Sequence, residues 1–112
     1  MIVDHRTYTI YPGKTPTFTK IYEEFGYPLQ QQYLGDCIGW YVSMDIGDLN
    51  QIVHLWRYKD LNDRAERRAK LGADENWTHY LTQATPLIQT MKNQILLAGP
   101  FFELEKLKYN KG

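Results

Sequence analysis

The sequence predicts an α+β domain in which a four-stranded antiparallel sheet carries two helices on one face. Three observations lead to this prediction. The chain has 112 residues, the size of one domain. Strand and helix patterns follow one another in the order β-α-β-β-α-β, the split βαβ arrangement. A β-hairpin around the turn residues Gly47–Asn50 leads directly into a charged helix, and the remaining elements can be placed against it.

The first strand is predicted over Ile2–Tyr11, which is rich in β-branched and aromatic residues and ends at Pro12-Gly13. Thr15-Pro16 then predicts the start of a helix. Apolar side chains follow at helical spacing, at Phe18, Ile21, Tyr22 and Phe25. Gly26 and Pro28 are expected to interrupt or kink this helix.

The hairpin strands are predicted over Cys37–Ile46 and Gln51–Tyr58. Both faces of the second of these are largely apolar, which indicates a central strand. In the split βαβ order the first strand of the chain lies beside it.

A helix capped by Asp60 or Asn62 is expected to end at Gly72, and a shorter one to start at Asp74. Met91–Leu97 is the fourth predicted strand.

Charge and composition exclude several classes of partner. The 13 basic and 13 acidic residues cancel, so no net charge attracts nucleic acid or an anionic membrane. No apolar stretch approaches the roughly 20 residues that span a bilayer, and no secretion signal is evident, so a cytoplasmic location without membrane insertion is expected. No Gly-rich phosphate loop occurs, and the histidines lack close metal-ligand spacing, so neither cofactor nor metal is expected.

The predicted sheet leaves one face without a cover. Two helices on one face use most of the chain, and aromatic residues make up 14% of it. An exposed aromatic face needs a partner, and a second copy of the chain is the economical one. We therefore expect a homodimer.

His54, Trp56 and Tyr58 project from one face of the central strand. A histidine among aromatic walls can act as a general base, because its ordinary pKa lies near neutrality. The alternative is a structural histidine at the dimer contact.

Arg6 and Tyr8 share a face of the first strand. Arg6 can bind a ligand carboxylate or phenolate with its planar fork, or it can form a structural ion pair with Asp4, Asp45 or a partner-chain carboxylate. Both interpretations remain open.

Other conspicuous residues favour structural roles. The basic stretch Arg64, Arg67, Arg68 and Lys70 is interpreted as a solvated helix face, in which Arg64 and Arg68 pair with Asp60. Trp77 and Tyr80 are expected to pack a helix on the sheet. Cys37 lacks an activating motif and is read as a small strand residue.

A set of short motifs spans Val3 to Ala98. They are Arg6-Thr7-Tyr8-Thr9, Pro12-Gly13-Lys14, Gly39-Trp40-Tyr41, Ile46–Gln51, His54–Tyr58, Asp63-Arg64, Arg67-Arg68-Ala69, Trp77, Tyr80-Leu81, Asn93 and Ile95-Leu96. The most specific part is His54–Tyr58 followed by Asp63-Arg64 and Arg67–Ala69 in this spacing. In these motifs the chain resembles the NIPSNAP family.

The resemblance implies a ferredoxin-like subunit over residues 1–100, a C-terminal extension over residues 101–112, and a dimeric α+β barrel with two sheets stacked around a central cavity. We expect this cavity to bind a small apolar or aromatic ligand. The expected lining is Arg6, Tyr8, Trp40, His54, Trp56 and Tyr58. The alternative, suggested by related dimeric barrels, is a cofactor-free monooxygenase or isomerase that acts on a phenolic or lactone substrate with His54 as general base.

Overall fold

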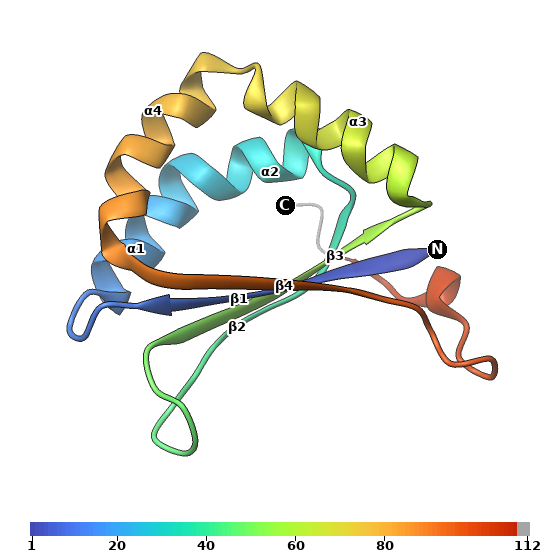
Figure 1. Cartoon of the computed structure of the whole chain (residues 1–112), viewed down its shortest axis with the longest axis horizontal. Helices are drawn as coiled ribbons and strands as arrows, with labels where there is room; N and C mark the ends of the chain where they lie inside the picture. Colours follow the sequence, from blue (N-terminus) through green and yellow to red (C-terminus); the bar gives the residue numbers. More distant parts are fainter. Residues whose placement is uncertain (110–112) are drawn as a thin grey trace.

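The computed structural model describes residues 1–109 and consists of one antiparallel sheet with helices packed on one face (Figure 1). The strand order is β2-β3-β1-β4. The strands are β1 (Ile2–Ile10), β2 (Asp36–Val42), β3 (Gln51–Tyr58) and β4 (Ile88–Leu96). The helical elements are α1 (Thr15–Ile21), η1 (Tyr22–Gly26), α2 (Tyr27–Tyr33), α3 (Leu61–Gly72), α4 (Glu75–Ala84), η2 (Thr85–Leu87) and η3 (Leu104–Lys106).

The predicted sheet topology is confirmed. β3 pairs with β2 on one side and with β1 on the other, so it lies inside the sheet as its apolar faces indicate. Two strand boundaries differ from the prediction by three residues or more. β2 ends at Val42 because residues 43–50 form a loop in which Asp45 and Asn50 have positive φ angles, and β4 begins at Ile88, three residues before the predicted start.

The helix is not broken at Gly26 and Pro28; its α-helical geometry is instead interrupted by the π-helical turn η1, which ends at Gly26. α1 continues through the π-helical turn η1 into α2, because Pro28 lies in the first turn of α2, where its missing N–H is tolerated. Buried side chains recur every four residues in this helix, at Phe18, Tyr22, Gly26 and Gln30. Four residues of an α-helix rotate about 40° beyond one full turn, so a row with this spacing would drift around the helix. The wider π turn offsets this drift and keeps the row facing the sheet. The same turn moves Phe25, predicted to be buried, to an exposed position.

The caps of the later helices follow the sequence. The Asp60 carboxylate accepts a hydrogen bond from the backbone N–H of Asp63 at 2.8 Å and starts α3. Asp74 does the same for the N–H of Asn76 at the start of α4. Gly72 is the last residue of α3, as predicted. None of the helices within residues 1–109 is long and apolar enough to cross a membrane.

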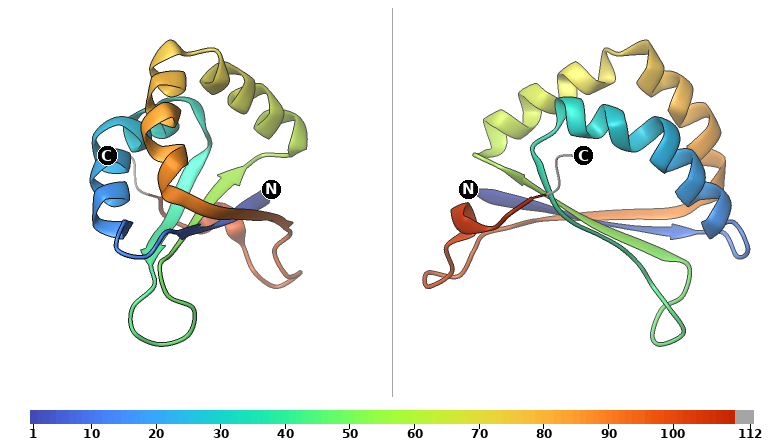
Figure 2. Two further views of the ribbon diagram at one scale, coloured as in Figure 1. Left: turned by 60° about the vertical axis from the view of Figure 1, so that its left-hand side comes forward. Right: turned by 180° about the vertical axis from the view of Figure 1, so that it is seen from behind.

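The two faces of the sheet have different surroundings (Figure 2). The helices cover the face that carries the even-numbered residues of β1 and β3, including Asp4, Arg6, Tyr8, His54 and Trp56, all buried. The aromatic face predicted to be uncovered therefore lies under the helices. The opposite face carries a mixture of aliphatic and polar side chains, and we call it the open face. Its strand residues are Val3, His5, Thr7, Thr9, Ile38, Tyr41, Gln51, Val53, Leu55, Arg57, Thr90, Lys92, Gln94 and Leu96.

One end of the open face is covered by the chain beyond β4. The Arg57 guanidinium donates to the carbonyl oxygens of Leu104 and Leu107 at 2.8 and 2.9 Å and pairs with Asp36. Leu104 is buried against this end of the sheet. Of the predicted extension, Leu104 and Leu107 are thus attached to the sheet, whereas residues 110–112 lie outside the described residues.

Candidate ligand-binding site

A cavity of about 220 Å³ lies between the sheet and the helices of the single chain. Side chains of β1 and β4 form one wall, and side chains of α2, α3 and α4 form the other. The polar and aromatic lining consists of Arg6, Tyr8, Gln30, Arg68, Trp77, Tyr80 and Thr85. The aliphatic lining consists of Leu81, Ala84, Ile88 and Met91.

Arg6 is fixed at the sheet side of this cavity. Its Nη1 pairs with Asp4 Oδ2 at 3.1 Å, and its Nε donates to the Tyr8 hydroxyl at 3.1 Å. Burial by itself lowers the pKa of Arg6, but the interactions with Tyr8 and Asp4 outweigh it and leave the pKa raised. Of the two interpretations left open by the sequence, the structure shows the ion pair with Asp4. The guanidinium nevertheless remains part of the cavity wall.

Two of the basic residues of α3, Arg64 and Arg68, turn towards the sheet, which corrects the sequence interpretation for them, whereas Arg67 and Lys70 are exposed as predicted. Arg64 crosses to the sheet and donates from Nε to Asp4 Oδ2 at 3.0 Å instead of pairing with Asp60. Arg68 is half-buried and lines the cavity. Among residues 1–109 its guanidinium makes no hydrogen bond or ion pair. Burial lowers the pKa of Arg68, and repulsion from Arg6 lowers it further.

His54 lies beneath the helices with none of its surface exposed, and it does not line the cavity. The indole N–H of Trp56 donates to its Nδ1 at 2.7 Å. A neutral ring then carries its proton on Nε2, which is buried without a partner in the described part of the chain. Burial, with repulsion from Arg6, lowers the pKa of His54 to about 3. The nitrogen that accepts protons is thus occupied, and the geometry does not support a general base here.

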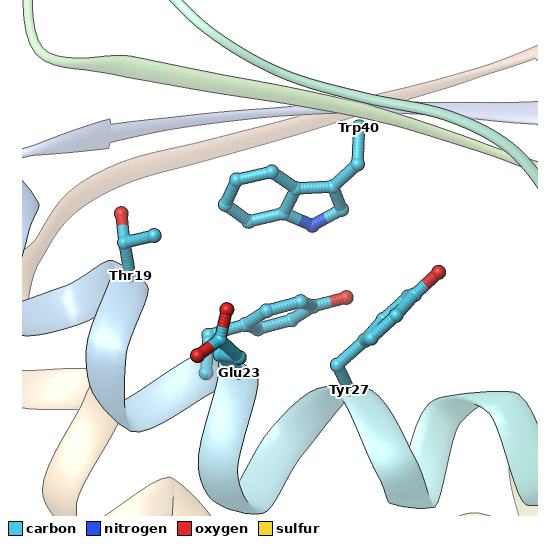
Figure 3. A pocket seen from close by; sticks show the side chains of 5 residues that line it. Thr19, Glu23, Tyr27 and Trp40 are labelled. Atoms are coloured by element: carbon cyan, nitrogen blue, oxygen red, sulfur yellow. The ribbon is translucent and has the colours of Figure 1, made fainter. Parts of the chain in front are cut away.

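Trp40 lines a separate groove on the other side of the first helix (Figure 3). This groove measures about 190 Å³ and is bounded by Thr19, Tyr22, Glu23, Tyr27 and Trp40. The Trp40 and Tyr22 rings lie 5.0 Å apart at 31°, which is a packing contact between strand and helix. Trp40 therefore does not contribute to the cavity that contains Arg6.

The predicted lining is only partly brought together. Arg6 and Tyr8 line the cavity, whereas His54, Trp56 and Tyr58 are packed in the core beside it. Burial raises the pKa of Tyr58 to about 12. None of the six predicted residues faces the space between two stacked sheets, because all of them lie on the helix-covered face or in the Trp40 groove.

Five polar or aromatic lining residues were missed as site residues: Gln30, Arg68, Trp77, Tyr80 and Thr85. Arg68 was assigned to solvent because charged helical residues usually face water. Its four-residue spacing from Arg64 places both side chains on one face of α3, and that signal was available in the sequence.

The NIPSNAP family model matches residues 3–102. The chain belongs to the NIPSNAP family. NipSnap homolog 2 of Danio rerio is 32% identical over 97 residues, which make up 86% of this chain and 32% of that protein. NipSnap homolog 3A of Homo sapiens is 26% identical over 104 residues, or 92% of this chain and 41% of that protein. The chain thus spans well under half the length of these two NIPSNAP relatives.

Solved structures show the same NIPSNAP fold. A NIPSNAP family protein from Agrobacterium tumefaciens is 42% identical, with a TM-score of 0.87 over 92% of this chain and 97% of that chain. A NIPSNAP-like domain protein from Burkholderia xenovorans is 41% identical, with a TM-score of 0.87 over 96% of this chain and 91% of that chain. An antibiotic biosynthesis monooxygenase is 20% identical, with a TM-score of 0.62 over 89% of this chain and 100% of that chain. This last likeness extends to the ferredoxin-like α+β fold alone.

Proposed function

We propose that this NIPSNAP protein binds a small molecule with an apolar or aromatic body in the cavity between its sheet and its helices. The observation that carries the proposal is the composition of the cavity wall. The Trp77 and Tyr80 rings pack against each other on one side, with their centroids 4.9 Å apart and their planes tilted by 31°. Aliphatic side chains surround them, and a few polar groups converge from β1, α2 and α3. Apolar walls with a few placed polar groups are typical of small-molecule sites.

The size of the cavity limits the ligand. Drug-sized ligands use pockets of roughly 300–1,000 Å³. About 220 Å³ instead suits a compound with one aromatic ring or a similar body. Binding is a better match than proton transfer, because the buried acceptor nitrogen of His54 is occupied by Trp56 and the ring does not reach the cavity.

The proposal can be tested by filling the cavity. Ala84 is buried and lines it, so Ala84→Leu should occupy the space without adding a polar group. Ligand-observed NMR with single-ring compounds, such as phenylacetamide and phenylacetate, should detect binding to the wild type and its loss in this variant. Ala65→Leu on the exposed side of α3 is the matched control. Equal binding by the wild type and Ala84→Leu, or no binding of either compound by the wild type, would contradict the proposal.

We further propose that two copies of the chain pair through their open faces. This face has Val53 and Leu55 at its centre and is otherwise mostly polar but uncharged. Among its described residues, only Lys92 is a charged group outside an ion pair, so two copies can meet with little repulsion.

Two apolar loops extend on the same side of the sheet (Figure 1). One carries exposed Met44, Ile46 and Leu49, and the other exposed Leu97 and Phe101. On the edge of a facing sheet these side chains would be covered, which supports a second copy as the occupant.

Sedimentation should show a dimer at micromolar concentration, and its interface should exceed about 1,000 Å². Val53→Lys on the open face should dissociate it by burying an unpaired charge, whereas Ala69→Lys on the exposed side of α3 should not. A stable wild-type monomer would refute this part of the proposal.

A further inference from the structure

We propose that the ligand of the cavity is a small aromatic carboxylic acid whose carboxylate binds to Arg68 beside Arg6. This inference rests on the proposed binding function and adds the chemical class of the ligand. The sequence predicted Arg6 as a ligand contact and Arg68 on a solvated helix face, whereas the structure places both in the cavity wall.

Positive charge outweighs negative charge around the cavity. Three guanidinium groups, those of Arg6, Arg64 and Arg68, converge on the helix-covered face, and they interact electrostatically with one another. Within residues 1–109, Asp4 is the one carboxylate paired with any of them. Its Oδ2 already accepts from both Arg6 and Arg64. The cluster therefore has an excess of positive charge that an anion would neutralise.

The Arg68 side chain is partly withdrawn from water. An arginine removed from water normally finds a partner, because an unpaired buried charge is costly. Arg68 is half-buried, has none among the described residues, and is repelled by Arg6. Such an arrangement is expected for a residue whose partner is a bound molecule.

The cavity wall also constrains the body of the ligand. The guanidinium of Arg68 and the Trp77 and Tyr80 rings line the same small cavity, with Ala84 and Ile88 next to them. A bare inorganic anion would leave this apolar wall in contact with water. An aromatic acid places its carboxylate on the planar fork of Arg68 and its ring against Trp77 and Tyr80.

The test compares phenylacetate with phenylacetamide, which has the same ring and no charge, by NMR titration of the full chain. Phenylacetate should bind more tightly. Arg68→Gln should weaken phenylacetate binding by about ten- to a hundred-fold and leave phenylacetamide nearly unchanged, because it removes one charge-assisted contact. Lys70→Gln removes an equal charge from the exposed side of α3 and should change neither affinity.

Thermal unfolding of the ligand-free variant supplies a second readout. If Arg68 serves the ligand, Arg68→Gln should be at least as stable as the wild type, since a repulsion is removed. A large loss of stability would assign Arg68 a structural role and overturn the inference.

The other outcomes are equally decisive. Equal binding of the acid and the amide would overturn the anion assignment while leaving the cavity as a binding site. Sulfate that competes as well as phenylacetate would identify a plain anion site and overturn the aromatic class. If neither phenylacetate nor phenylacetamide binds, the proposed function itself is wrong.

Discussion

The buried state of His54 makes a quantitative prediction about the dependence of stability on pH. The folded protein holds the pKa of His54 at about 3, whereas an unfolded histidine titrates near about 6.5. Between these values the unfolded chain binds a proton that the folded protein does not. Stability therefore rises with pH across this window, and it falls as the pH drops from 6.5 towards 3.

The size of the effect follows from the two pKa values. Within the window each pH unit changes the free energy of unfolding by about 1.4 kcal/mol. From pH 7 to pH 5, His54 alone should lower the free energy of unfolding by about 2 kcal/mol. His54→Asn removes the titrating group while its side-chain oxygen can still accept from the Trp56 indole N–H. The variant should be less stable at pH 7, because a smaller side chain fills the core less well, but its loss from pH 7 to pH 5 should be about 2 kcal/mol smaller.

Urea unfolding at both pH values measures this difference. The comparison between variant and wild type cancels the contributions of the carboxylates, which titrate in both proteins. His79→Asn, on the exposed side of α4, is the matched control for the loss of a histidine. Parallel loss of stability in the wild type and His54→Asn would refute the account. An NMR titration that places His54 near 6.5 in the folded protein would do the same and would reopen the general-base hypothesis.

Other parts of the fold make separate predictions. A Cβ on Gly35 would lie 1.9 Å from the Arg57 carbonyl oxygen, so Gly35→Ala should cost at least about 3 kcal/mol in urea unfolding, whereas Gly72→Ala, with open space around it, should change little. Asp4→Asn should cost about 3 kcal/mol, because two arginines lose their anion; a loss below about 1 kcal/mol would disprove this. Arg57→Met should speed amide exchange over residues 104–107 and leave the helices protected.

The sequence predicts the fold well because its signals are local and agree with one another. Strand alternation, the Asp60 and Asp74 caps and the hairpin each fix a short segment, and together they determine the order of the elements. Gly26 and Pro28 were expected to interrupt or kink the helix because both residues often end helices, yet the helix continues past them. Here Gly26 supplies the space for the Tyr80 ring, since a Cβ would lie 2.7 Å from it, and that contact is tertiary.

The site was less predictable, for a physical reason. Alternation along β1 and β3 correctly placed Arg6 and Tyr8 on one face and His54 with Trp56 on one face, but a strand pattern does not say which face the helices cover. Assigning these residues to a space between two sheets depended on that unknown. The role of Arg68 depended on how closely α3 approaches the sheet, which no local pattern contains.

A crystal structure of the protein with phenylacetate would test the central claim most directly. The account predicts the carboxylate of the ligand within about 2.7–2.9 Å of the guanidinium of Arg68, the distance of a charge-assisted hydrogen bond, with the ring against Trp77 and Tyr80 inside a single subunit. A ligand held between two facing sheets, against His5 and Thr7 of the open face, would contradict it.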